Sequence, residues 1–163
     1  MNLSELFLQK LKELGSVEKL LIDALPALVA ASSDPELQAA FAEHLKQTEA
    51  QAKRIEKAFA SLRLQSESST CKPMVALIAD ASEAALIEPV GLIRDIAILG
   101  AATRVEHFEI AAYFSAISLA KTLSYGDAAN LLVENLTEEQ KAADHLKKIS
   151  NSLLKRAQDG ASE

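Results

Sequence analysis

The sequence predicts an all-α fold, a four-helix bundle with an additional short helix in the crossover between the second and third long helices. The composition supports helices: 49% of the 163 residues are hydrophobic, but only 4% are aromatic, and there are five Gly and four Pro. Ala and straight-chain residues lose little conformational freedom in a helix. Apolar residues also recur at alternating spacings of four and three along four long segments, the pattern of one buried helix face.

Breaks in this pattern divide the chain into elements. Ser32–Asp34 interrupts the first pattern, and Pro35 suits the first turn of a new helix. The polar, Ser-rich stretch Gln65–Thr70 indicates a loop, and Ser124–Asp127 indicates a tight turn. We expect helices over about Ser4–Ala31, Pro35–Arg63, Pro73–Ile87, Leu92–Leu123 and Ala128–Ala157. Residues 1–157 are therefore expected to form a single domain, and residues 158–163 a polar, frayed C-terminal tail.

The lengths of the connections predict the topology. Short links make the first and second long helices antiparallel, and likewise the third and fourth. The connection between the second and third is long and contains the short helix, which permits a crossover running back along the bundle. This is the ferritin-like connectivity.

Composition also excludes several classes of protein. The net charge is −6, from 17 basic and 23 acidic residues, and the chain has no basic patch, so we expect no nucleic-acid partner. No apolar run approaches the ~20 residues needed to cross a bilayer, and no signal peptide is visible at the N-terminus. We therefore expect a cytoplasmic protein with no membrane partner. Cys71 is the sole cysteine, which rules out an internal disulfide.

Polar residues interrupt the apolar faces near the middle of all four long helices. A lone buried carboxylate or histidine more often sets helix register or satisfies a core hydrogen bond. Here, however, several would converge at one level of the bundle, since antiparallel helices of similar length share a midpoint. The candidate metal ligands are Glu18, His44, Gln47, Glu106, Glu109 and Glu139, with Gln47 at the edge of its helix face.

Like charges this close could not all ionise without a cation. Two divalent metal ions would neutralise them, and we expect iron in preference to manganese, because carboxylate and imidazole ligands in helix bundles typically hold such pairs. Tyr113, one turn beyond Glu109, is either a contact of a bound ligand or a core aromatic residue. We expect His107 to point away from the site.

The sequence also resembles the YciE/YciF family of bacterial ferritin-like, rubrerythrin-like stress proteins across nearly the whole chain. The resemblance rests on these residues: Ser16–Lys19, Ala24–Pro26, Pro35–Leu37, Glu43–Leu45, Cys71, Met74, Val105–Tyr113, Glu138, Glu139, Ala143, Asp144 and Leu146. The segment from Glu106 to Tyr113 is the most specific. The resemblance implies a stress-associated bundle that commonly forms a homodimer.

The sequence departs from the family in the second helix, where Gln47 precedes Thr48 and the family usually has Glu. Two functions therefore stay open. One is a buried carboxylate-rich di-metal protein acting on oxygen or peroxide. The other is a non-enzymatic stress or scaffold bundle with a degenerate or empty metal site.

Overall fold

The computed structural model describes residues 1–160, and these form an all-helical bundle, which confirms the predicted fold class. Each predicted helix is present with its ends within a few residues of the expected positions. The helices are α1 (Leu3–Ala31), α2 (Pro35–Ser61), α3 (Lys72–Ala84), α4 (Leu92–Thr122) and α5 (Gly126–Gly160).

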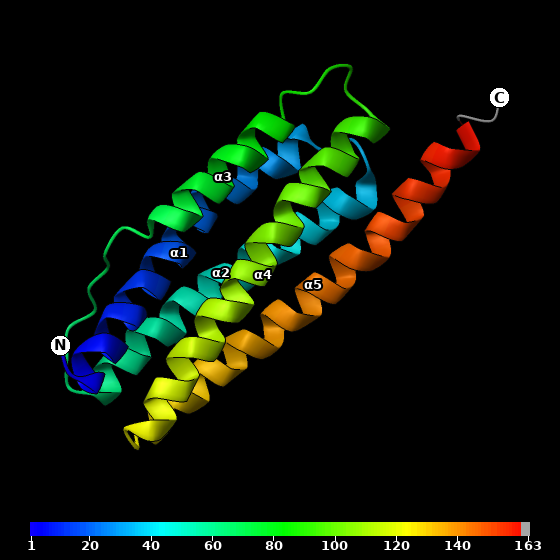
Figure 1. Ribbon diagram of the computed structural model, residues 1–163. Coiled ribbons are helices and arrows are strands. Elements are labelled where there is room, and N and C mark those ends of the chain that lie inside the picture. The colour runs from blue at the N-terminus through cyan, green and yellow to red at the C-terminus, as the bar shows by residue number, and fades with distance from the viewer. Residues whose placement is uncertain (161–163) are drawn as a thin grey trace.

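The crossover lies as the connection lengths predicted. In Figure 1, α1 and α2 run in opposite directions, as do α4 and α5, and the link after α2 returns along the bundle to α3. This link is tied to α1, because the Ser69 amide donates to the Lys12 carbonyl at 3.3 Å and the Cys71 amide to Ser16 Oγ at 3.1 Å. α3 then packs against α1 and α4. The bundle proper is formed by the four long helices, with α3 beside it.

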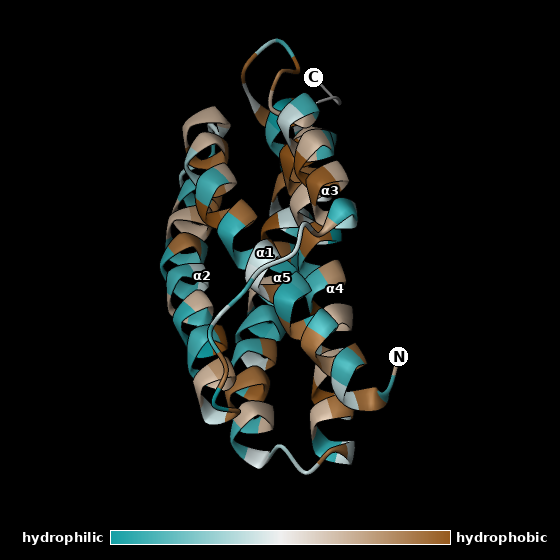
Figure 2. Cartoon of the chain, turned by 90° about the vertical axis from the view of Figure 1, so that its left-hand side faces the viewer, coloured by the Kyte–Doolittle hydropathy of each residue, from teal (hydrophilic) through white to brown (hydrophobic). Residues whose placement is uncertain are grey.

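Two apolar clusters form the core, and a polar layer lies between them. One cluster gathers around Phe7, Phe59 and Leu132, near the end of the bundle that holds the N-terminus. The other gathers around Leu25 and Phe41, toward the opposite end. Figure 2 shows hydrophilic and hydrophobic positions alternating along the helices, as burial of one face requires. The polar layer consists of Glu18, His44, Thr48, Gln51, Glu106, Glu109, Asn135 and Glu139, all of them buried.

The N-terminal half of α4 differs from the expected single apolar face. Leu92 and Ile96, which the spacing places on one face with Leu99, are only partly buried. Leu99 is almost completely buried, and so is Ile98, which lies off that face. The reason is that α4 contacts α1, α3 and α5 and therefore buries more than one face. A single face of heptad spacing could not anticipate this.

The turn between α1 and α2 is held by charged groups that the sequence did not reveal. The buried Asp95 carboxylate of α4 accepts hydrogen bonds from the Ser33 amide at 2.8 Å and the Asp34 amide at 2.9 Å. Asp34 caps α2 through the amides of Glu36 and Leu37 and accepts a hydrogen bond from Arg156 of α5 at 2.6 Å. Three helices thus meet at one end of the bundle.

The C-terminal helix is longer than predicted. α5 continues to Gly160, so residues 158–160 of the expected tail are helical, and residues 161–163 lie outside the described part of the chain. Among residues 1–160, no helix combines the length and the apolarity that crossing a membrane would require.

Candidate metal centre

Four of the six predicted ligands come together inside the bundle. His44 from α2, Glu106 and Glu109 from α4, and Glu139 from α5 each offer one donor atom, and these atoms lie within 4.8 Å of one another. All four side chains are buried. Glu106 and Glu109 are three residues apart and so share a helix face. The convergence at the middle of the bundle is the arrangement that the sequence pattern predicted.

Glu18 lies beside this group of four. It is fully buried on α1, and one of its carboxylate oxygens, Oε1, accepts a hydrogen bond from the Tyr113 hydroxyl. Tyr113 Oη in turn accepts a hydrogen bond from Asn135 Nδ2 at 2.9 Å. Tyr113 is therefore a core aromatic residue whose hydroxyl is satisfied and which orients Glu18.

Many polar atoms of the site have no protein partner. Among the described residues, eight buried side-chain atoms of the polar layer make no hydrogen bond. They are Glu18 Oε2, His44 Nδ1 and Nε2, Gln51 Oε1, Glu106 Oε2, Glu109 Oε1 and Oε2, and Glu139 Oε2. His44 Nε2 lies 3.4 Å from Glu106 Oε1 but is not aligned to donate. Leaving one buried polar group unpaired typically costs about 1–3 kcal/mol, so a cluster of eight such atoms is suited to bind a cation.

The electrostatics of the site point the same way. Burial raises the pKa of Glu18, Glu106 and Glu109 well above the ordinary value, and the neighbouring charge of Glu139 raises each further. For Glu18 the hydrogen bond from Tyr113 acts in the opposite direction but does not outweigh these effects. Without a cation, the carboxyl groups would therefore tend to hold protons.

The residues present fit a pair of divalent ions. Four carboxylates can carry four negative charges, which two divalent cations would balance, and oxygen and imidazole nitrogen donors suit iron and manganese. No cysteine contributes, since Cys71 lies at the start of α3, bonded through its amide to Ser16. A thiolate-bound zinc or iron–sulfur site is excluded at this place.

Gln47 is placed at the margin of the site. Its side chain is half-buried and lines a polar pocket of about 610 Å³ that also touches His44 and Glu106. Glu49, an acidic residue two positions after Gln47 on α2, is exposed, and so is His107 on α4, as expected for a residue that points away. α2 thus contributes one ionisable donor to the centre, His44.

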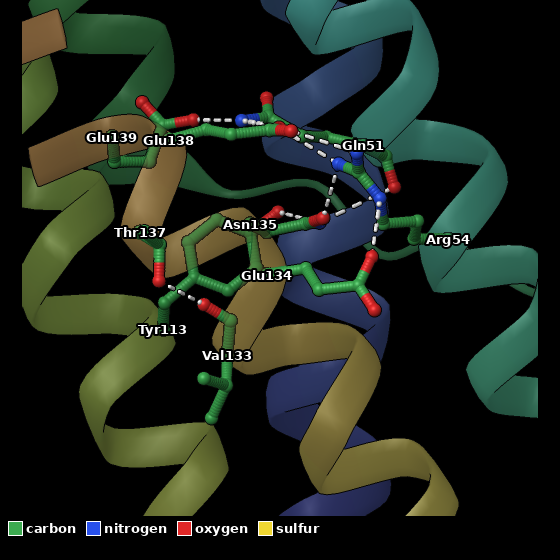
Figure 3. A network of polar contacts seen from close by, with 9 residues as sticks. All are labelled: Gln51, Arg54, Tyr113, Val133, Glu134, Asn135, Thr137, Glu138 and Glu139. Atoms are coloured by element: carbon green, nitrogen blue, oxygen red, sulfur yellow. Dashed lines mark hydrogen bonds and ion pairs between the residues drawn. The ribbon is translucent and has the colours of Figure 1, made fainter. Parts of the chain in front are cut away.

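A second polar network borders the site on the α2–α5 side (Figure 3). Arg54 binds both oxygens of Glu138 at 2.7 Å and donates to Asn135 Oδ1 at 3.0 Å. Gln51 donates to Glu139 and, at 3.2 Å, to Glu138. The sequence pattern gave no signal for Arg54, because it does not lie on the apolar face of its helix. Asn135 could have been found, since it lies one turn before Glu139 on α5.

Comparison with known proteins agrees with this description. A family model described as a domain of unknown function (DUF892) matches residues 2–159. Protein YciF of Escherichia coli K12 is 38% identical over 144 residues, which cover 88% of this chain and 86% of that protein.

Solved structures show the same fold. The crystal structure of the E. coli stress protein YciF superposes with a TM-score of 0.91 at 34% identity, covering 94% of this chain and 98% of that one. A putative structural protein from Rhodopseudomonas palustris, YcfI, superposes with a TM-score of 0.87 at 30% identity, covering 90% and 94% of the two chains. A Xanthomonas campestris protein at 18% identity, with a TM-score of 0.70 and coverage of 94% and 97%, shares the fold.

Proposed function

We propose that this chain, which belongs to the YciF-containing family described as a domain of unknown function (DUF892), binds two divalent metal ions between its long helices and acts on oxygen or peroxide. The ligands would be Glu18, Glu106, Glu109 and Glu139, with His44 as the imidazole donor and Gln47 at the margin. Iron is favoured over manganese. The observation that carries the proposal is the set of eight buried, unpartnered polar atoms in the polar layer, together with the close approach of donor atoms of His44, Glu106, Glu109 and Glu139.

The protein's own residues would have distinct tasks at such a centre. Glu106 and Glu109, on one face of α4, and Glu139, on α5, would hold the ions from two sides of the bundle. Tyr113 would keep Glu18 in place through its hydrogen bond to Oε1 and leave Oε2 free to bind. A bound pair of iron ions would supply one-electron and two-electron chemistry toward oxygen or peroxide. The two apolar clusters would keep bulk water from reaching it along the bundle axis.

Elemental analysis by mass spectrometry tests the first half of this proposal. Protein without a histidine tag, produced with added iron and manganese, should contain about two metal ions per chain. Glu106→Ala and Glu139→Ala should lose metal, whereas Glu49→Ala, an exposed carboxylate on α2, should keep it. Folded wild-type protein without metal would contradict the proposal.

Consumption of hydrogen peroxide and of oxygen by the iron-loaded protein tests the second half. Wild-type protein and the Glu49→Ala control should react at equal rates, and Glu106→Ala should lose the reaction together with its metal. Metal that is bound but unreactive toward both oxidants would limit the site to a structural role.

The alternative is a bundle without enzymatic activity whose metal site is degenerate. Two observations favour it: Gln47, at the margin of the site, is neutral, and the Gln51 amide donates to an oxygen of Glu139. The R. palustris relative is described as a putative structural protein. Against it stands the cost of so many unpaired buried groups, because fixing helix register requires one polar residue rather than a whole layer.

Association with a stress response is part of the proposal, because the E. coli relative is described as a stress protein. We also propose a homodimer, as the family resemblance implies. Light scattering coupled to size-exclusion chromatography measures its mass directly. A single monomeric peak across the accessible concentration range would contradict the dimer without bearing on the metal site.

A further inference from the structure

A second pocket reaches the candidate metal centre from the side of the crossover helix. It has a volume of about 490 Å³, which lies within the usual range for sites that bind small molecules. α1, α2, α3 and α4 all contribute to its walls, and Leu21, Leu25, Phe41, Ile78 and Val105 are among its large side chains. Its lining includes exposed residues of α1, of α3 and of the segment just after α3, namely Asp23, Val75 and Leu86. The pocket therefore opens at the surface and is lined mainly by carbon atoms.

Polar groups line this pocket where it meets the candidate metal centre. His44 and Glu106 both line it, and both are more than nine-tenths buried. Both nitrogens of the His44 ring and Oε2 of Glu106 have no hydrogen-bond partner among the described residues. The pocket thus combines an apolar wall with hydrogen-bonding groups that nothing in the protein satisfies.

The opposite side of the same two residues faces a different environment. The polar pocket near Gln47 is also lined by His44 and Glu106, but its other walls carry charged side chains of both signs, Glu36, Glu43, Lys46 and Lys141. Ions and water would be expected on that side. The apolar pocket contains no lysine or arginine, so it offers no counter-charge for an anionic ligand.

We propose that the apolar pocket binds a small molecule with an unbranched apolar tail and a neutral O–H head, an alcohol or an organic hydroperoxide, whose head reaches His44 and Glu106. The tail would lie between α1, α3 and α4. A carboxylate head would meet Glu106 and its acidic neighbours without a compensating cation, which disfavours a fatty acid. This assignment rests on the proposed function only where it names an organic hydroperoxide as the oxidant. Burial of the apolar tail, which would provide most of the affinity, does not depend on metal.

Titration calorimetry with 1-octanol tests the pocket, using the protein as purified and again after chelation of metal. Octanol should bind in both states, and octanoate should bind at least tenfold more weakly. From hexanol to nonanol, the affinity should rise about threefold to fourfold for each added methylene, because each buries a similar apolar area. In nuclear magnetic resonance spectra, the octanol chain should show contacts to the methyl groups of Ala24 and Ala81, which line the pocket.

Pocket-filling variants provide the matched comparison. Ala24→Leu on α1 and Ala85→Leu at the C-cap of α3 should each weaken octanol binding at least tenfold, with an unchanged helical circular dichroism spectrum. Ala42→Leu adds the same side chain to the polar pocket instead and should leave octanol binding intact. The contacts in wild-type spectra decide the question even if a filled variant does not fold.

Several outcomes would overturn this inference. They are an affinity independent of chain length, octanoate binding as well as octanol, and octanol binding unchanged in both filled variants. Competition between octanol and dimerisation would assign the pocket to a second copy of this chain instead. Failure of the metal analysis alone would overturn the proposed function and leave the pocket assignment standing.

Discussion

Tyr113 donates its phenolic hydrogen to Oε1 of Glu18, a residue 95 positions earlier in the chain, and both side chains are completely buried. This contact joins α1 to α4 at the level where the two apolar clusters meet. Asn135 donates to the same hydroxyl from α5. A polar chain across three helices therefore holds one predicted ligand while leaving its second oxygen, Oε2, without a partner.

Tyr113→Phe should lower the free energy of unfolding by about 1–3 kcal/mol, because Glu18 Oε1 loses its partner and so does one amide hydrogen of Asn135. Urea denaturation measures the loss. Tyr125→Phe is the control, since the Tyr125 hydroxyl makes one part-buried contact, with Ser4 Oγ at 3.2 Å. An equal effect of the two substitutions would contradict the structural role assigned to Tyr113. If Tyr113 only orients Glu18, the metal content should fall less than in Glu106→Ala.

Glu109→Gln should stabilise the metal-free protein and weaken metal binding. Burial and the charges of Glu139, Glu18 and Glu106 raise the pKa of Glu109. When the pKa of a carboxyl group is higher in the folded than in the unfolded protein, its favourable contribution to stability is fully present below the unfolded-state pKa. That contribution is lost as pH rises through the folded-state pKa. The free energy of unfolding of the variant should therefore exceed that of wild type by on the order of 1 kcal/mol at neutral pH. This difference should vanish as the pH is lowered toward 4.5, the ordinary pKa of a glutamate.

Urea denaturation of chelated protein across this pH range measures the gap. Glu49→Gln, which neutralises an exposed carboxylate on α2, is the control and should show no such pH dependence. If the metal-free Glu109→Gln variant were less stable than wild type at neutral pH, burial of the Glu109 carboxyl group would not destabilise the folded protein.

The stabilising contribution of Asp34 should be lost in acid. Burial acts to raise its pKa, but hydrogen bonds from Arg156 and from the amides of Leu37 and Glu36 outweigh it and hold the pKa below the ordinary value of 3.8. A depressed pKa means stability that is present above 3.8 and is lost as pH falls through the folded value. The difference in unfolding free energy between wild type and Asp34→Asn should thus shrink below about pH 4.

Two further variants check the origin of this effect. Arg156→Gln should remove much of the difference, because it removes the charged partner of Asp34. Asp80→Asn removes a solvent-exposed ion pair with Arg104 and should change stability by only about 0–1 kcal/mol. A constant difference between wild type and Asp34→Asn from neutral to acid pH would contradict the assigned interactions.

Gln47→Glu should strengthen metal binding, because it adds a carboxylate to the pocket that His44 and Glu106 line. Competition with a chelator such as EDTA measures the change, and we expect at least a tenfold slower loss of metal. Ala39→Glu adds the same charge to the same pocket two helical turns away and is the control. Equal retention in both variants would attribute the gain to net charge alone.

The helices could be predicted from the sequence because helix formation and burial leave a local signal. The spacing of Phe7, Leu11, Leu14, Leu21, Leu25 and Leu28 marks one face of α1, and every one of these residues is buried. Asp34 and Pro35 mark the beginning of α2. The ends of α3 and α5 were less exact, since helix ends depend on what they pack against.

The candidate site was predictable where a polar residue replaces an apolar one on a buried face. Glu18, His44, Glu106, Glu109 and Glu139 were identified in this way, and all are buried in the polar layer. Arg54 and Asp95 gave no such signal. Arg54 reaches its partners on α5 from the edge of its helix, and Asp95 binds backbone amides of a distant turn.

The sequence by itself determined the helices, their faces and the level at which polar residues enter the core, because each of these follows from the period of a single helix. The tertiary structure alone decided which donors meet. It separates Gln47 from the buried group, bonds Tyr113 to Glu18, and brings Arg54 to Glu138. It also leaves an apolar pocket beside His44. These relationships depend on how far each helix is rotated and shifted against its neighbours, which no local spacing records.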